Sequence, residues 1–134
     1  MKYKSILAAL VILAVTALWA DKKFTFTNSS LNPAAAGTID VGTDQNGNNA
    51  FTIRAYHLAE PGQLTPAKSV YVVWVQRNGE AAQNLGQLTV NHDLEGTFDG
   101  KTPDKDFDVF ITAEDSAKAE TPSSMEVLRA KVQH

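Results

Sequence analysis

The chain of 134 residues is long enough for one domain with its own hydrophobic core. Its 12 Lys and Arg against 15 Asp and Glu make it acidic, which argues against nucleic acid as a partner. It contains no cysteine, so disulfide bonds, thiolate metal sites and thiol catalysis are excluded.

The first 20 residues have the pattern of a secretory signal peptide. Lys2 and Lys4 precede an apolar run over 6–15, and small residues fit cleavage after Ala17 or Ala20. The whole apolar stretch is about 15 residues long, short of the roughly 20 that span a bilayer. We therefore expect an exported protein of the bacterial periplasm or extracellular space, with no membrane span after cleavage. Retention of the leader as an anchor is the alternative.

The rest of the chain is expected to form one domain. Residues 21–36 are expected to be a loosely ordered lead-in, with 24–27 as a candidate strand. From 37 to 134, short β-rich runs alternate with turn signals, and no window has apolar residues at helical spacing. The runs expected as strands are 38–43, 50–57, 69–76, 86–91, 96–99, 107–114 and 126–133.

Three dipeptides that favour positive φ fall between these runs. Asn46-Gly47 and Asn78-Gly79 stand between strong strand candidates and predict hairpins. Asp99-Gly100 predicts a further turn. The longer segments 58–68 and 115–125 carry prolines and are expected to be loops at the ends of the fold.

The placement of apolar residues predicts how the strands pack. The run 69–76 is apolar on both faces, which is typical of a strand covered from both sides, and its Trp74 is expected to be buried. The other runs are apolar at alternate positions, as at Phe51, Ile53 and Ala55. Strands of this kind form sheets with one apolar face, and two such sheets bury these faces against each other. The sequence therefore predicts an all-β fold, an antiparallel β-sandwich of about seven strands that is immunoglobulin-like in general architecture.

Part of this pattern resembles a known family. The residues that carry the resemblance are Tyr71-x-x-Trp74-Val75, Asn78-Gly79, Asn84-Leu85-Gly86-x-Leu88, the run 107–114 and Pro122-Ser123. Their order is similar to that in the C-terminal extracytoplasmic domain of anti-sigma-K factors. The resemblance implies a small β-sandwich outside the membrane. In that family a spanning helix joins the sandwich to a cytoplasmic sigma-binding domain. A leader stands in the place of that helix here, and the loop after Glu114 lacks the family's glycine pair, so sigma binding is assigned to no residue.

Catalytic and calcium motifs are weak in this sequence. The histidines are His57, His92 and His134, and there is no G-x-S-x-G, so we expect a protein that is not an enzyme and uses no cofactor. Residues 44–49 carry oxygen side chains at alternate positions. The EF-hand glycine and its final acid are missing, however, so a polar hairpin turn is favoured.

A second acidic segment offers the other metal candidates. Asp104, Asp106 and Asp108 would share one face of an extended strand. Protection of an exposed strand against edge pairing is favoured over metal binding. In that interpretation Asp108 faces Arg129 or Lys131 on a neighbouring strand.

Arg54, Tyr56 and Phe110 lie on the outward faces of their predicted strands. Aromatic and guanidinium side chains at a surface are typical anchors for a partner, and partial burial under the long loops is the alternative. We therefore expect an exported, non-catalytic binding or accessory module of the cell envelope, which takes a protein partner or a small ligand. The alternatives are an extracytoplasmic sensory component, as the resemblance implies, and a calcium-stabilised structural protein.

Overall fold

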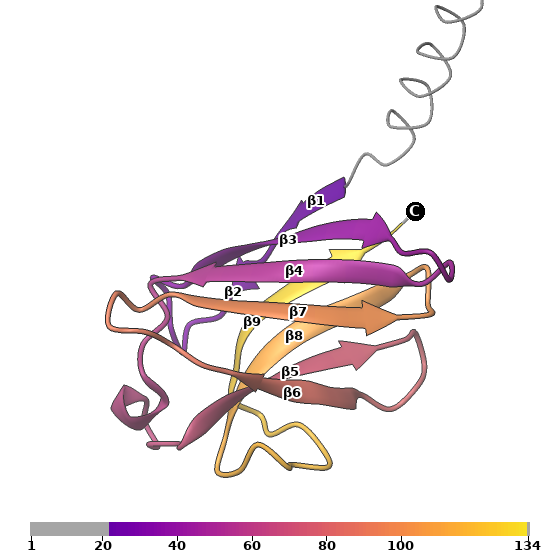
Figure 1. Ribbon diagram of the computed structural model, residues 1–134. Coiled ribbons are helices and arrows are strands. Elements are labelled where there is room, and N and C mark those ends of the chain that lie inside the picture. The colour runs from indigo at the N-terminus through magenta and orange to yellow at the C-terminus, as the bar shows by residue number, and fades with distance from the viewer. Residues whose placement is uncertain (1–21, 134) are drawn as a thin grey trace, which may run out of the picture.

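The computed structural model describes residues 22–133, so the predicted leader lies outside the described residues. Within that range the chain is all-β, with one short 3-10 helix at Pro61–Gln63 (Figure 1). No helix in this range is long and apolar enough to cross a bilayer. The strands are β1 (Lys22–Thr25), β2 (Thr27–Asn28), β3 (Ala36–Thr43), β4 (Asn49–Tyr56), β5 (Val70–Gln76), β6 (Gln83–Leu88), β7 (Gly96–Thr102), β8 (Phe107–Glu114) and β9 (Glu126–Val132).

These strands form two antiparallel sheets that pack face to face. Sheet A has the order β1-β3-β4-β7, and sheet B has the order β2-β9-β8-β5-β6. The predicted β-sandwich is confirmed, with nine strands in place of about seven. β7 is an edge strand of sheet A and β6 is an edge strand of sheet B, and the two lie next to each other on one side of the molecule (Figure 1). That side is open because the two strands do not pair with each other.

The two additional strands come from the segment expected as a loose lead-in. β1 pairs with β3 and β2 pairs with β9, so residues 22–28 join both sheets. Phe26, between the two strands, is only 6% exposed, and its backbone N–H donates to the backbone O of Gly37. Burial of this aromatic ring in the core, with Phe24 packed against the same core, anchors the segment.

The core between the sheets follows the alternation of the sequence. Its fully buried residues include Ile39, Ile53, Val73, Val109 and Ile111. β9 departs from the alternation, because its pairing with β8 shifts register and places both Val127 and Leu128 in this core. Consecutive residues of a regular strand point to opposite faces, so the bulge is what turns Val127 inward.

The two Asn-Gly turns are confirmed, whereas Asp99-Gly100 is not a turn. Gly47 (φ 82°) follows β3 and Gly79 (φ 77°) follows β5, each in the left-handed region that favours glycine. The strand predicted to end at position 99 continues as β7 to Thr102. A Cβ on Gly100 would lie 2.5 Å from Cζ of the buried Phe51 ring. This glycine therefore allows close packing inside a strand.

The outer face of sheet B is covered by the loop over residues 115–125. The Asn84 side-chain amide of β6 donates to the backbone O of both Ala117 and Ala119, at 2.9 Å each. Ala119 packs against a second apolar cluster on this face. The prediction that β5 is covered on both faces is confirmed by this cluster, whose buried members are Val72, Trp74 and Phe110.

Tyr71 in β5 is fully buried, and its hydroxyl donates a hydrogen bond to the backbone O of Ala59. Burial raises the pKa of Tyr71 to about 12, above the value near 10 of an exposed tyrosine. The stabilisation linked to this shift is fully present below the unfolded pKa and is lost as the pH rises through the folded pKa. We therefore expect the unfolding free energy of the wild type to fall relative to that of Tyr71→Phe between about pH 10 and pH 12. Urea denaturation at several pH values measures this, and a constant difference between the two proteins would contradict it.

Candidate functional site

The structure separates the three residues that were predicted to contact a partner. Arg54 and Tyr56 lie on the outer face of β4 in sheet A, and both are exposed. Phe110 lies on the outer face of sheet B but is only 3% exposed. It stacks with Trp74, and the guanidinium carbon of Arg129 lies 4.1 Å from its ring centroid. Phe110 is therefore a packing residue beneath the loop, and only Arg54 and Tyr56 are available at the surface.

An ion-pair network borders this packed cluster. Arg129 donates from Nη1 to Asp108 at 2.8 Å and from Nη2 to Glu126 at 2.7 Å. Of the two predicted cross-strand partners of Asp108, the structure selects Arg129. The hydrogen bonds to Glu126 raise the pKa of the Arg129 guanidinium against the opposing effect of burial. Arg129 therefore stays positively charged, and the network holds its guanidinium over the Phe110 ring.

The three aspartates that were weighed as metal ligands do not converge. Asp104 accepts a hydrogen bond from Arg77 at 3.2 Å, and Asp108 accepts one from Arg129. Asp106 is exposed on the connection between β7 and β8. Within residues 22–133, no group of three or more His, Asp or Glu side chains is placed to hold a metal ion.

Asp44 organises the hairpin that had suggested calcium. Its Oδ1 accepts the backbone N–H groups of Asn46 and Asn48 at 2.9 Å each, and Lys101 Nζ lies 3.6 Å from its Oδ2. Burial acts to raise the pKa of Asp44, but these hydrogen bonds and Lys101 outweigh burial and lower the pKa. The oxygen side chain thus stabilises a turn, as the hairpin interpretation predicts.

A buried chain of hydrogen bonds closes the outer face of sheet B. Trp74 Nε1 donates to the Thr112 hydroxyl at 2.8 Å, and that hydroxyl donates to Glu114 Oε2. The backbone N–H of Ser123, in the covering loop, donates to the same Glu114 oxygen at 2.8 Å. Glu114 is only 6% exposed. Because each member of the chain has a partner, the covering loop is fastened over this part of the face. A separate cavity of about 430 Å³ lies at the other end of the face, where Gln76, Asp108 and Lys131 line it.

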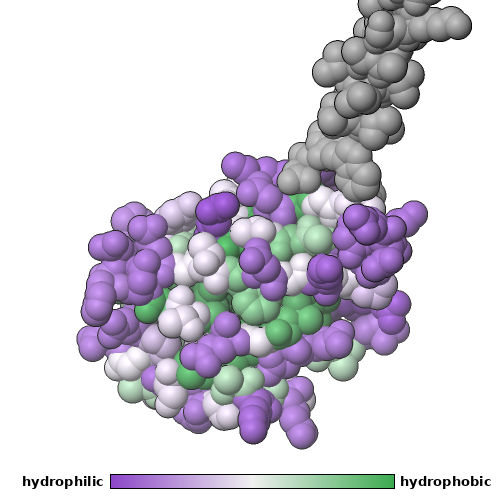
Figure 2. Space-filling view, viewed as in Figure 1, coloured by the Kyte–Doolittle hydropathy of each residue, from purple (hydrophilic) through white to green (hydrophobic). Residues whose placement is uncertain are grey.

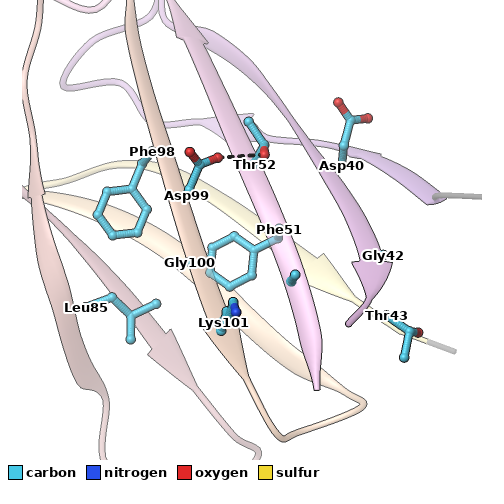
Figure 3. Close-up of a pocket in the computed structure, with 11 residues that line it drawn as sticks. Asp40, Gly42, Thr43, Phe51, Thr52, Leu85, Phe98, Asp99, Gly100 and Lys101 are labelled. Atoms are coloured by element: carbon cyan, nitrogen blue, oxygen red, sulfur yellow. Dashed lines mark hydrogen bonds between the residues drawn. The ribbon is translucent and has the colours of Figure 1, made fainter. Parts of the chain in front are cut away.

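A cavity of about 640 Å³ extends from the outer face of sheet A, where Asp40, Gly42 and Thr52 line it, around β7 to Leu85 at the open side of the sandwich. Its apolar lining is formed by Phe51, Leu85 and Phe98. Figure 3 shows the Leu85 and Phe98 side chains in the space between β6 and β7, with the Phe51 ring beside them. We call the space bounded by these three side chains and by Asp99 and Gly100 the edge cleft.

A β-bulge brings Leu85 into the edge cleft. In the pairing of β5 with β6, Val73 faces Gly86 and Trp74 faces Asn84, which leaves Leu85 without an opposite residue. Gly86 has φ 138°, a conformation that L side chains rarely adopt. Bulges at sheet edges redirect a side chain, and the sequence Asn84-Leu85-Gly86 has this effect here.

The rim of the edge cleft is polar and carries both charges. Thr52 Oγ1 donates to Asp99 Oδ1 at 2.7 Å, the contact dashed in Figure 3. Lys101 follows on the same face of β7, because it pairs with Ala50 while Asp99 pairs with Thr52. The outer face of this edge strand therefore carries a negative side chain at Asp99 and a positive one at Lys101.

The surface view agrees with this arrangement. Figure 2 shows apolar surface gathered over the middle of the visible side, with hydrophilic side chains around it. The sequence did not predict Leu85 or Phe98 as cleft residues, because Leu85 stands before its predicted strand and the strand that contains Phe98 was predicted to end too early. The signal that could have found them is a nearby glycine, Gly86 directly after Leu85 and Gly100 two positions after Phe98, because a glycine in a strand marks a bulge or a close approach.

Comparisons with known proteins give no relative for this chain. No protein-family model, no curated protein and no solved structure matches it.

Proposed function

We propose that the protein is an exported, non-catalytic binding module of the cell envelope that holds an extended polypeptide segment of a partner protein in the edge cleft. The observation that supports this proposal is the position of the cavity, part of which lies beside the edge of β7 that pairs with no strand within residues 22–133. Export is proposed from the signal pattern in the first 20 residues.

The backbone of β7 favours a polypeptide over other ligands. Within the described residues, β7 pairs with β4 and with no other strand. In an antiparallel ladder, successive residues direct their N–H and C=O groups alternately to either side, so about half of these groups in β7 point away from β4. A row of such groups is a template for another strand. A sugar or a lipid does not offer a matching ladder.

The side chains of β7 specify the pattern of the added strand. Gly100 shares the inner face with Phe98, whereas Asp99 and Lys101 lie on the outer face. A residue opposite Gly100 would place its side chain toward Phe98 and Leu85. In an antiparallel arrangement the residue before it faces Lys101 and the residue after it faces Asp99. The segment that fits therefore reads acidic, apolar, basic from its N-terminus.

The uncovered face of sheet A extends this surface toward Arg54 and Tyr56. Along β4, Thr52 faces Asp99 and Arg54 faces Thr97, so Arg54 is the next outward position from the cleft rim. Contacts with exposed side chains of this kind set orientation and association rate more than affinity. We assign Arg54 and Tyr56 this flanking role.

We expect Leu85→Asp to weaken binding of a synthetic peptide with the acidic, apolar, basic pattern. The loss should be at least about tenfold, because burying a leucine contributes about 1.5–3 kcal/mol and 1.4 kcal/mol is a factor of ten. Fluorescence anisotropy of the labelled peptide measures the affinity. The double replacement of Arg54 and Tyr56 by alanine should weaken binding less than Leu85→Asp does.

Leu94→Asp is the matched control, because Leu94 is an exposed leucine, at 37%, that does not line the edge cleft. This change should leave peptide affinity as in the wild type. Equal affinities of the Leu85→Asp protein and the wild type would contradict the proposal, as would equal binding of a peptide whose central apolar residue is replaced by aspartate.

The resemblance to anti-sigma-K factors supports one alternative proposal, a sensory component outside the membrane. The resembling residues Tyr71, Trp74, Asn84 and the run 107–114 all lie in β5, β6 and β8, which are neighbours in sheet B. This role requires a separate membrane chain as partner. Stable co-purification of the protein with a membrane chain would favour the sensory role. Purification without any membrane chain would favour the peptide-binding role.

A further inference from the structure

Two Asn-Gly dipeptides lie at turns of this sandwich. The asparagine side chain of such a dipeptide can react spontaneously, and the proposed binding does not involve this reaction. The backbone nitrogen of the glycine can attack the side-chain carbonyl carbon of the asparagine, because glycine has no Cβ to obstruct the approach. The glycine nitrogen bonds to this carbon and gives up its proton, the bond from the carbon to the side-chain nitrogen breaks, and that nitrogen leaves as ammonia with the proton. A succinimide ring remains. Water then opens the ring to aspartate or isoaspartate, without oxidation or reduction.

Asn46-Gly47 is held in a network that opposes this reaction. The Gly47 N–H donates to the backbone O of Asp44 at 3.2 Å. The Asp44 carboxylate also accepts the backbone N–H groups of Asn46 and Asn48. The attacking nitrogen is thus engaged as a donor, and the backbone on both sides of Asn46 is fixed.

Asn78-Gly79 lacks such a network. Its turn is closed by the Glu80 N–H, which donates to the backbone O of Arg77 at 2.9 Å, and within residues 22–133 the Gly79 N–H makes no backbone hydrogen bond. Both dipeptides are exposed, and nothing lies within 4 Å of the position that a Cβ on Gly47 or Gly79 would occupy, so access does not separate the two sites. Arg77 and Glu80, whose charged groups lie 3.8 Å apart, place charges of both signs beside this turn, so the difference from Asn46 lies in the hydrogen bonding of the backbone.

We propose that Asn78 is a site of spontaneous conversion to aspartate and isoaspartate, and that Asp44 protects Asn46 from the same reaction. The product carries one new negative charge beside Arg77. Arg77 lies 3.2 Å from Asp104 and 3.8 Å from Glu80, so the new carboxylate competes with existing partners. The isoaspartate form also adds one carbon atom to the backbone of the turn between β5 and β6. This conversion does not depend on the proposed binding function.

The test is incubation of the purified protein at physiological pH and temperature, followed by peptide mapping that separates asparagine, aspartate and isoaspartate. We expect Asn78 to convert at least about tenfold faster than Asn46, the ratio that corresponds to breaking one or two net hydrogen bonds. Asp44→Ala should raise the rate at Asn46 by about the same factor and leave the rate at Asn78 unchanged.

Asn78→Gln is the matched control, because the longer side chain must close a larger ring and should remove the signal at position 78. Equal conversion at Asn46 and Asn78 in the wild type overturns the proposal. So does an unchanged rate at Asn46 in an Asp44→Ala protein whose circular dichroism spectrum matches that of the wild type. The wild-type ratio decides the question by itself if Asp44→Ala does not fold.

Discussion

Replacing Trp74 with alanine is expected to lower the free energy of unfolding by about 3–5 kcal/mol, the cost of removing a fully buried large aromatic side chain. Trp74 is 0% exposed, although it lies on the outer face of sheet B and outside the core between the sheets. Its ring stacks with Phe110, and its indole N–H donates to Thr112. The change removes the packing and leaves the Thr112 hydroxyl without its donor. Urea denaturation measures the loss.

Trp74→Phe separates these two contributions. Trp74→Phe keeps an aromatic ring against Phe110 but cannot donate to Thr112. We therefore expect its free energy of unfolding to lie between those of the wild type and of Trp74→Ala. A loss for Trp74→Ala below about 1 kcal/mol is the size of a surface substitution. That result would show that loop 115–125 does not seal this face.

Glu114→Ala is expected to cost about 2–4 kcal/mol and to release loop 115–125. The change removes the acceptor of two donors, the Thr112 hydroxyl and the Ser123 backbone N–H. A buried donor left without a partner costs about 1–3 kcal/mol. Denaturation measures the free energy, and amide hydrogen exchange over residues 115–125 measures the opening of the loop.

Glu126→Ala is the matched control for this prediction. Glu126 is also a glutamate on sheet B, but it pairs with Arg129 where both side chains are 35% exposed. Pairs of this kind contribute about 0–1 kcal/mol, so its loss should be smaller and should leave exchange in loop 115–125 unchanged. Similar losses for the two variants would contradict the fastening role of Glu114.

The sequence predicted most of the sandwich, because a period of two identifies strands whose faces differ in polarity. It predicted the inward face of β4 and the double burial of β5 correctly. It failed where one residue breaks the period. The bulge in β9 that brings Val127 into the core depends on its register with β8, and no local signal encodes that register.

Two further differences have a tertiary cause. Residues 22–28 were expected to be loosely ordered apart from a candidate strand at 24–27, and their order depends on Phe26 reaching the shared core. Asp99-Gly100 has the composition of a turn, but the glycine is required by the Phe51 ring that packs against it. In both places a distant aromatic side chain overrides the local preference, as tertiary packing does for strand propensities generally.

The candidate site was only partly predictable. Alternation placed Arg54 and Tyr56 on an exposed face correctly, because β4 is covered on one side only. The same rule placed Phe110 outward, and the alternative given for these residues, burial under a long loop, is what the structure shows for Phe110. The edge cleft could not be predicted, because it depends on β6 and β7 becoming the final strands on the same side of two different sheets.

Hydrogen exchange of the β7 amides tests the central claim of strand addition most directly. In the unbound protein, amides of Gly96–Thr102 that point away from β4 should exchange readily, since no other strand of the described chain pairs with β7. Addition of the peptide with the acidic, apolar, basic pattern should slow exchange at alternate residues of this strand, as new ladder hydrogen bonds form. Bound peptide with unchanged exchange throughout β7 would contradict the account.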